Sequence, residues 1–397
     1  MSKLAVRGGK RECVVRWPTW PVSGAPERRA LLGVLESGKW WYGENVRAFE
    51  KAFASFQKAA HGVTCTSGTA GLEISLGALG VGPGDDVIVP AYTFIATASA
   101  VVRAGARVVF ADVLAGNLCI DPADVERKLT ARTRAVVPVH FGGNICDMDR
   151  LNAIAGKRGL VVIEDACHAW GSFWKGTGAG ALGTCGAFSF QVSKNITAGE
   201  GGIVLANDAG IAEKCRAFTN CGRREGALWY KHFTPATNAR MTEFQAAILL
   251  QQLKRLAAQT RAREASAQVL DAGLGGIPGI VPQKTDPRMT GRSYHLYAFR
   301  LDLERLGISR ERFLQALSAE GVPSMAGYGI PVYGNPVFTG HDGGAGIRHG
   351  GAPCPESEKV ARDTCWIAQS VLLAGKPAMH AIVRAAAKVV ENLSELR

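Results

Sequence analysis

Short apolar segments alternate with longer stretches of helical periodicity between residues 60 and 205 of this 397-residue chain. This alternation is typical of crossover units, in which right-handed connections through helices build a mostly parallel sheet. We therefore predict an α/β fold whose first strand ends at Cys65. Six further strands are expected at 86–89, 107–111, 134–139, 160–164, 186–190 and 202–205, with helices at 69–80, 92–103, 121–129 and 147–158.

A second, smaller domain is expected at the C-terminal end, because a chain of this length exceeds one ordinary core. Residues 239–265 carry an apolar stripe at helical spacing, over a length that commonly joins two domains. We predict a large domain of residues 1–258, including the N-terminal segment, and a small α/β domain of residues 259–397. In the small domain, a strand is expected at 293–301, a helix at 309–320 and helical structure over 357–393.

The composition argues against several kinds of partner. Lys and Arg exceed Asp and Glu by 12, yet the basic residues are scattered and are not interleaved with stacking aromatics, so we expect no nucleic-acid partner. The ten cysteines lack the CxxC spacing of metal and redox sites. No apolar stretch has the length of a membrane span, and the N-terminus does not resemble a signal peptide, so we expect a cytoplasmic protein with no membrane partner.

The segment at residues 64–75 is suited to binding phosphate. A strand ends at Cys65, and Ser67, Gly68 and Thr69 open the helix that follows. The N-terminus of a helix offers unpaired N–H groups and the positive end of the helix dipole, and both favour an anion. An ordinary hydroxyl cap of the helix is the alternative interpretation.

Two later strands lead into ionisable residues. The apolar strand at 160–164 runs into Glu164 and Asp165, and the carboxyl end of a parallel strand faces the crevice in which α/β sheets bind ligands. Lys194 follows another buried strand, between Ser189 and a glycine-rich turn. Each residue alone also has a structural interpretation, as a helix-capping acid or as a solvated surface lysine.

Taken together, the phosphate site, the acid and the lysine meet the needs of pyridoxal 5'-phosphate. That cofactor requires a lysine that forms a Schiff base, an acid that keeps the pyridine nitrogen protonated, and a site for a phosphate dianion. All three features follow strand ends in this sequence. The sequence therefore predicts carbonyl chemistry through pyridoxal phosphate.

Six motifs in a fixed order extend this interpretation along nearly the whole chain. They are SGKWWYGENVRAFEKAFA (37–54), VIVPAYTFIATASA, DACHAWGS, FSFQVSKNITAGEGG, TNARMTEFQAAI (237–248) and CPESEKVARDTCWIAQSVLL (354–373). In this order they resemble the DegT/DnrJ/EryC1/StrS family of sugar aminotransferases. The resemblance implies the aspartate-aminotransferase-like fold type I, with a mostly parallel seven-stranded sheet in the large domain. It also implies a homodimer with shared active sites, and glutamate or glutamine as the amino donor.

The resemblance further implies roles around the cofactor ring. Lys194 would form the Schiff base and move the proton in the amino transfer, and Asp165 would pair with the pyridine nitrogen. Tyr92 in PAYTF would lie over the ring. His168 fills a slot in which most sugar aminotransferases of the family have a glutamine that hydrogen-bonds the cofactor's phenolic oxygen, and an imidazole can donate the same bond.

Phosphate binding is implied for a second set of residues. Gly68 and Thr69, with Ser189, would hold the phosphate, and Asn238 in TNARM would reach it from the partner subunit. Other residues that are candidates for the site, each with a structural alternative, are His140, Arg223, Arg224, His295, Tyr297 and Tyr328.

We therefore expect transfer of an amino group to a keto group on a sugar, including nucleotide-linked sugars, or on a keto-cyclitol in amino-sugar or secondary-metabolite biosynthesis. His168 and the tryptophan-rich segments 17–21 and 37–41 also resemble the branch that contains 3-amino-5-hydroxybenzoate synthases. An aminating and aromatising synthase of that type is thus an alternative. A non-catalytic, cofactor-binding regulator on the same fold is a third hypothesis. The family's dehydratase branches have histidine in place of the lysine, whereas this chain keeps Lys194.

Overall fold

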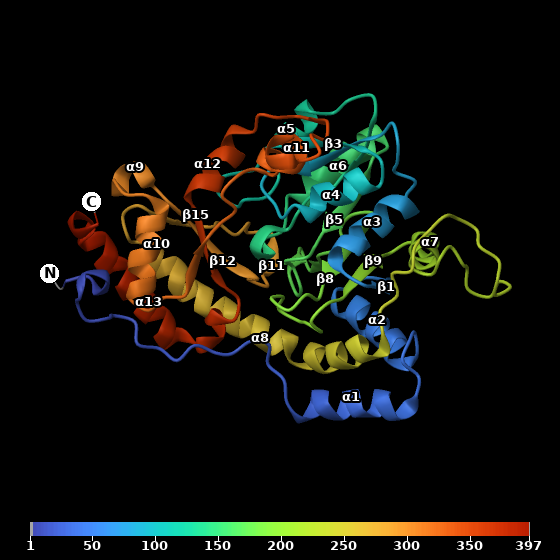
Figure 1. Cartoon of the computed structure of the whole chain (residues 1–397), viewed down its shortest axis with the longest axis horizontal. Coiled ribbons are helices and arrows are strands. Elements are labelled where there is room, and N and C mark those ends of the chain that lie inside the picture. Colours follow the sequence, from blue (N-terminus) through green and yellow to red (C-terminus); the bar gives the residue numbers. More distant parts are fainter. Residues whose placement is uncertain (1–2, 397) are drawn as a thin grey trace.

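An eight-stranded sheet forms the centre of the computed structural model, which describes residues 3–396 (Figure 1). Its strand order is β1-β9-β8-β5-β4-β2-β3-β14, and every neighbouring pair is parallel except the two that involve β9. The strands are β1 (His61–Cys65), β2 (Asp86–Pro90), β3 (Arg107–Ala111), β4 (Thr133–Val136), β5 (Val161–Asp165), β8 (Cys185–Ser189), β9 (Gly202–Ala206) and β14 (His349–Gly350). Each of the seven predicted strands is therefore present, and the two-residue β14 joins them from the C-terminal part of the chain.

Both faces of this sheet are buried, which explains why its strands are continuous apolar runs. Successive side chains of β2 enter different cores, because Val87 and Val89 lie in one hydrophobic cluster and Ile88 in another. One face is covered by α3 (Gly68–Ala78), α4 (Ala96–Arg103) and α7 (Ala209–Thr219), whose buried residues share the cluster of Val87. The cluster of Ile88 includes residues of α2 (Glu44–Phe56), α5 (Pro122–Arg127), α6 (Met148–Arg158) and α8 (Glu243–Gly275).

The helix predicted at 92–103 begins later than expected, at Ala96. Residues 92–95 instead form an irregular connection at the carboxyl end of β2. Within it, Tyr92 is 1% exposed and Phe94 is 57% exposed, so the two aromatic side chains lie in different environments. The apolar periodicity that suggested one helix continues through this connection, and periodicity alone does not mark the first helical residue.

A second sheet of four antiparallel strands lies in the C-terminal part, in the order β10-β12-β15-β13. The prediction of helical structure throughout 357–393 was wrong, because Thr364–Ala368 forms the strand β15 between α12 and α13. Short apolar runs are ambiguous in sequence, and pairing with two neighbouring strands makes this one a strand. The elements here are β10 (Ile280–Pro282), β12 (Leu296–Leu301), β13 (Ser324–Ala326), β15, α9 (Leu303–Leu306), α10 (Arg310–Ala319), α11 (Pro336–Thr339), α12 (Pro355–Asp363) and α13 (Lys376–Glu391). A small three-stranded sheet is formed by β6 (Phe173–Trp174), β7 (Thr177–Gly178) and β11 (Met289–Gly291).

The long helix α8 contacts both α2 and α13, so the predicted boundary at residue 258 falls within one continuous helix. The N-terminal segment, which we expected to belong with the large domain, packs differently. Leu4 and Cys13 lie in the hydrophobic cluster of β12 and α13, and the segment then runs along α13 and α8 to α1 (Ala25–Ser37) (Figure 1). Within residues 3–396, no helix combines the length and the apolar character needed to cross a membrane.

Candidate active site

A cavity of about 590 Å³ opens at the carboxyl ends of β5 and β8. Strand ends in an open α/β sheet are the expected place for a ligand, because helix N-termini and loops converge there. Six of the eight predicted site residues line this cavity, namely Gly68, Thr69, Asp165, His168, Ser189 and Lys194. The structure thus brings together residues from three separate segments of the chain, which span residues 68–194.

The N-terminus of α3 forms the end of the cavity that is suited to binding a phosphate. Ser67 caps the helix by accepting a hydrogen bond from the backbone N–H of Ala70 at 3.1 Å. The backbone N–H groups of Gly68 and Thr69 donate no hydrogen bond to any described residue, so they are available to an anion. A side chain at Gly68 has no room, because a Cβ there would lie 2.6 Å from Sγ of Cys167 and 2.8 Å from Cβ of Ser189.

Asp165 is a buried carboxylate that the fold holds in one orientation. Thr97 Oγ1 donates a hydrogen bond to Oδ2 of Asp165 at 2.8 Å, and the backbone N–H of Cys167 donates to Oδ1 at 3.2 Å. Asp165 is the last residue of β5, and its carboxylate lines the cavity. Thr97 was not predicted from sequence, since a threonine inside a helix has no distinguishing motif.

Lys194 lies in a turn after β8 that is bonded internally. The backbone N–H of Lys194 donates to the carbonyl of Gln191 at 2.9 Å, and Thr197 Oγ1 donates to the carbonyl of Phe190 at 2.8 Å. The Nζ atom lies 5.7 Å from the ring centroid of the buried Trp170. Desolvation lowers the pKa of Lys194 below the ordinary lysine value, which increases the share of the neutral, nucleophilic amine.

His168 is set in the tautomer that donates from Nε2. The backbone N–H of Gly142 donates to Nδ1 of His168 at 3.3 Å, so Nδ1 carries a lone pair and the proton of the neutral ring is on Nε2. Desolvation, and secondarily the charge of Lys194, lower the pKa of His168 well below the ordinary value, so the ring is neutral. An Nε2–H donor at the cavity is the hydrogen-bonding group that the resemblance to the family implies at this position.

His295 is set in the opposite tautomer. Asn195 Nδ2 donates to the carbonyl of Ser293 at 2.8 Å, which turns Asn195 Oδ1 toward Nδ1 of His295 at 3.2 Å. Because that oxygen can only accept, Nδ1 of the neutral His295 carries the proton and Nε2 has the free lone pair. The rings of His168 and His295 are 4.5 Å apart, so the cavity has one imidazole that donates beside one that accepts.

Two predicted residues do not line the cavity. Tyr92 packs in the core against Phe141 and Tyr328, at centroid distances of 5.3 and 5.5 Å, whereas Phe94 lines the cavity. This placement disagrees with the prediction that Tyr92 lies over the cofactor ring. Phe94 is the aromatic residue at the cavity, and it was not among the residues predicted from the sequence. Asn238 is exposed on the connection between α7 and α8 and pairs with Asn220.

The other candidate residues are divided between the cavity, the core and the surface. His295 and Tyr328 line the cavity, but Tyr297 is buried elsewhere and donates to Asp271 at 2.9 Å. His140 is fully buried and bonded to Glu164 at 2.7 Å, which favours a structural role. The arginines Arg223 and Arg224 lie over the rings of Trp229 and Phe233 and are absent from the cavity lining.

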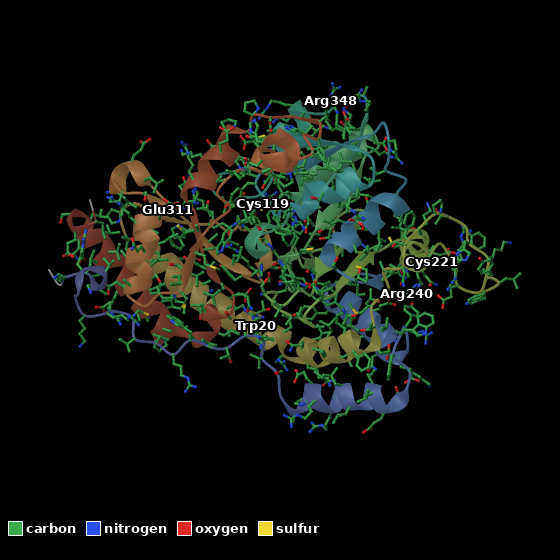
Figure 2. All side chains as sticks on the ribbon, in the orientation of Figure 1. Trp20, Cys119, Cys221, Arg240, Glu311 and Arg348 are labelled. Atoms are coloured by element: carbon green, nitrogen blue, oxygen red, sulfur yellow. The ribbon has the colours of Figure 1, made fainter. Side chains whose placement is uncertain are left out.

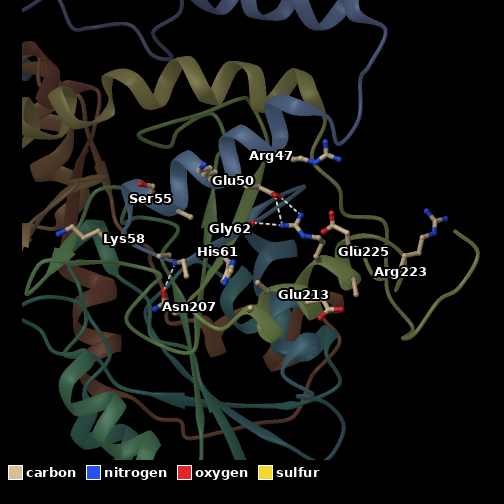
Figure 3. Close-up of a pocket in the computed structure, with 18 residues that line it drawn as sticks. Arg47, Glu50, Ser55, Lys58, His61, Gly62, Asn207, Glu213, Arg223 and Glu225 are labelled. Atoms are coloured by element: carbon tan, nitrogen blue, oxygen red, sulfur yellow. Dashed lines mark hydrogen bonds and ion pairs between the residues drawn. The ribbon is translucent and has the colours of Figure 1, made fainter. Parts of the chain in front are cut away.

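A second hollow, of about 950 Å³, lies between α2, β1 and α7 (Figure 3). Two of its charged groups, Arg216 and Glu50, bond to each other at 3.1 Å. It contains none of the eight predicted site residues. The cavity at the ends of β5 and β8 is therefore the candidate active site.

The comparisons with known proteins show the family to which the chain belongs. Residues 22–385 match the DegT/DnrJ/EryC1/StrS aminotransferase family. The chain is 38% identical to an L-glutamine:2-deoxy-scyllo-inosose aminotransferase from Micromonospora echinospora, over 100% of both chains. It is 37% identical to a 3-amino-5-hydroxybenzoate synthase from Amycolatopsis mediterranei (strain S699), over 94% of this chain and 97% of that protein. A crystal structure of 3-amino-5-hydroxybenzoic acid synthase matches with a TM-score of 0.87 and 35% identity, covering 96% of this chain and 100% of the other.

The architecture is that of the fold type I aminotransferases. The chain belongs to the DegT/DnrJ/EryC1/StrS family, and it is an aminotransferase. This assignment excludes the hypothesis of a non-catalytic regulator, and aminotransferases of the family use pyridoxal phosphate.

Proposed function

We propose that this protein binds pyridoxal phosphate in the cavity at the ends of β5 and β8. We propose further that it moves an amino group from glutamine or glutamate to a keto group on a cyclitol or sugar ring. The observation that carries the proposal is the convergence of Lys194, Asp165 and the unbonded amides of α3 on one cavity. When bound, the cofactor supplies an electron sink for the negative charge that develops at the carbon bearing the amino group.

The residues present fit this cofactor. The amides of Gly68 and Thr69, with the hydroxyl of Ser189, form a cradle for a phosphate dianion. The Asp165 carboxylate, held in place by its two donors, would pair with a protonated ring nitrogen. His168 offers Nε2–H to an anionic oxygen on the ring, as its tautomer requires.

Lys194 and Phe94 complete the proposed site. Lys194 Nζ, whose pKa is lowered by desolvation, takes and returns the proton that must move between two carbons during the amino exchange. Phe94, 57% exposed at the cavity, covers one face of a flat ring and limits its tilt.

The similarity to an enzyme that acts on a scyllo-inosose with L-glutamine favours glutamine as donor and a keto-cyclitol as acceptor. A second candidate function rests on the similarity to 3-amino-5-hydroxybenzoate synthase, and the matching crystal structure supports it. In that reaction, amination of a ring is followed by loss of water and formation of an aromatic product. The cavity described above is compatible with both rings.

A homodimer is part of the proposal. The connection between α7 and α8 projects from the body of the molecule (Figure 1) and exposes Leu228, Trp229 and Tyr230 at 81, 74 and 78%. Such a cluster of exposed apolar side chains favours burial against another surface. Asn238 follows it in the same connection, which supports the expected role of this residue at the phosphate of the partner subunit.

A two-stage measurement tests the proposed function. Protein loaded with pyridoxal phosphate is mixed with L-glutamine, and conversion to the amine form of the cofactor is followed by absorbance. We then expect 2-deoxy-scyllo-inosose to restore the aldehyde form and give an aminated cyclitol, detected by mass spectrometry. Failure of glutamine and glutamate to cause the first change would reject the proposal. An aromatic product from a carboxylated ring, without amination of the cyclitol, would favour the synthase.

A further inference from the structure

A buried guanidinium without an acidic partner lies beside the substrate cavity. Arg263, on α8, is fully buried, and in the described chain its hydrogen bonds all go to Gln369. Its Nη1 has no hydrogen-bond partner among residues 3–396, and the guanidinium carbon lies 5.6 Å from the ring centroid of Trp20. Trp20 is labelled in Figure 2. Buried charges are ordinarily paired with an opposite charge, because an unpaired one carries a large desolvation penalty.

Arg263 also fixes which end of the Gln369 amide faces the cavity. Two guanidinium nitrogens donate to Gln369 Oε1, at 3.1 and 2.5 Å, and a guanidinium has no acceptor. The Nε2 of Gln369 therefore points away from Arg263 and donates one long bond, 3.4 Å, to the carbonyl of Ser193. Its second N–H makes no hydrogen bond within residues 3–396, and Gln369 lines the cavity.

The other charged groups of the cavity show why Arg263 and Gln369 matter for binding a substrate. Its ionisable lining residues, besides the two neutral histidines, are Asp165, Glu200, Lys194, Tyr328 and the partly buried thiol of Cys167. No arginine is among the described lining residues, and Arg263 is the one arginine that hydrogen-bonds to a lining residue in the described part of the chain. An amino-acid donor nevertheless brings a carboxylate into this space, in addition to the phosphate held at α3.

We propose that Gln369, oriented and polarised by Arg263, binds a carboxylate of the substrate. The inference rests on the proposed function, because it concerns a substrate of the same site. The amide Nε2–H donates to a carboxylate oxygen, and the guanidinium behind the amide supplies a positive charge in addition to Lys194. The carboxylate in turn supplies the negative charge that is missing next to Arg263. Two substrates can supply this carboxylate, namely the amino-acid donor and an acceptor ring that bears a carboxylate.

A binding measurement on the pyridoxal-phosphate-loaded protein tests the proposal without catalysis. The probe is glutarate, a dicarboxylate that has no amino group to transfer, and its Kd is measured by calorimetry. We expect Gln369→Glu and Gln369→Leu each to raise the Kd of glutarate roughly tenfold or more, which corresponds to the loss of a hydrogen bond to a charged group. The Glu variant should have the larger effect, because it adds a negative charge that pairs with Arg263. Binding within about twofold of the wild type in both variants would overturn the proposal.

Two controls keep the result specific. Gln268→Glu makes the same change of charge at an exposed position of α8, and we expect no change in the Kd of glutarate. Glutaramide, the neutral diamide, should bind the wild type and Gln369→Leu with similar affinity. Equal weakening of glutaramide and glutarate would instead mean that Gln369 only supports the Lys194 turn through Ser193, and it would also overturn the proposal.

The kinetics of the two half-reactions identify the source of the carboxylate. If the donor is bound, the apparent Kd for L-glutamine in single-turnover conversion rises roughly tenfold in Gln369→Glu. If Gln369 binds a carboxylate of the acceptor, the glutamine reaction is unchanged in the variant. Binding of 3-oxocyclohexane-1-carboxylate is then weakened, whereas binding of 2-deoxy-scyllo-inosose is not. A third outcome is that the wild-type protein never reacts with glutamine, although its binding of glutarate depends on Gln369. That outcome would support the carboxylate site and reject the proposed function.

Discussion

The two walls of the substrate cavity are built in different ways. One wall comes from the end of the large sheet, where Asp165 ends β5, Ser189 ends β8 and Lys194 follows β8. The other wall contains His295 and Gln369, which lie on segments that pair through β12 and β15, with Leu296 opposite Ala368. The first wall holds the groups suited to chemistry and the second holds groups suited to selecting a substrate. Changes in the first wall should therefore affect every substrate, and changes in the second should alter their ratio.

The largest effect is expected from Lys194→Ala, which removes the reactive amine from the strand-end wall. We expect amino transfer to fall by roughly 10³-fold or more with every acceptor, and the visible absorbance of the protein-bound cofactor to disappear. Steady-state rates and an absorbance spectrum after dialysis measure both. Lys175→Ala, at an exposed ion pair with Asp149, is the control and should keep both properties. A persistent visible band would mean that another lysine holds the cofactor.

Asp165→Asn should have the next largest effect. The amide keeps the size of the side chain but loses the charge that stabilises a protonated ring nitrogen, so single-turnover rates should fall by about 10²-fold for donor and acceptor alike. Thr97→Val removes one of the two donors to Asp165 and should cause a smaller loss in the same direction. Unchanged rates in Asp165→Asn would separate this carboxylate from the chemistry.

Gly68→Ala should weaken the phosphate end of the same wall. The added Cβ would lie 2.6 Å from Sγ of Cys167, so the start of α3 must shift. We expect a loss of about 1–3 kcal/mol in the free energy of unfolding and a weaker Kd for pyridoxal phosphate. Denaturant unfolding and cofactor titration measure the two effects. Gly33→Ala, inside α1, adds a Cβ that meets no atom within 4 Å, so it should leave the Kd unchanged and raise the free energy of unfolding by about 0.5–1 kcal/mol.

The pair Phe94→Ala and Tyr92→Leu tests which aromatic residue covers the ring. We expect Phe94→Ala to raise the Kd of pyridoxal phosphate by roughly fivefold to tenfold, from the loss of an aromatic contact. Tyr92→Leu also removes an aromatic ring, but one that packs in the core and does not line the cavity, so it should lower the free energy of unfolding and leave this Kd nearly unchanged. The reverse pattern would restore Tyr92 to the role predicted from the sequence.

The smallest effect is expected from His168→Gln. Glutamine can donate a hydrogen bond from its amide as His168 does from Nε2, so rates should stay within about threefold of the wild type. His168→Phe keeps a flat ring without a donor and should reduce the rates further. A large loss in the glutamine variant would indicate that the imidazole has a role beyond this hydrogen bond.

Much of the fold was predictable because its signals are local. Each strand of the large sheet is an apolar run closed by polar residues, and both faces of such a sheet are buried, so the runs are continuous. The strand β15 was mistaken for helix, because Thr364–Ala368 is apolar in either structure and only its pairing with β12 and β13 decides. Likewise, nothing local distinguishes His349–Gly350 as the edge strand of a sheet formed mainly by residues 61–206.

The sequence by itself determined the aminotransferase class, because Lys194, Asp165 and the start of α3 stand in motifs whose spacing places them at neighbouring strand ends. Tertiary structure decided what those motifs leave open. It buried Tyr92 and exposed Phe94, it set His168 and His295 in opposite tautomers, and it placed Arg263 behind Gln369. The physical reason is that a strand end is a property of local periodicity, whereas a tautomer, an orphaned charge or a buried ring depends on partners from distant segments.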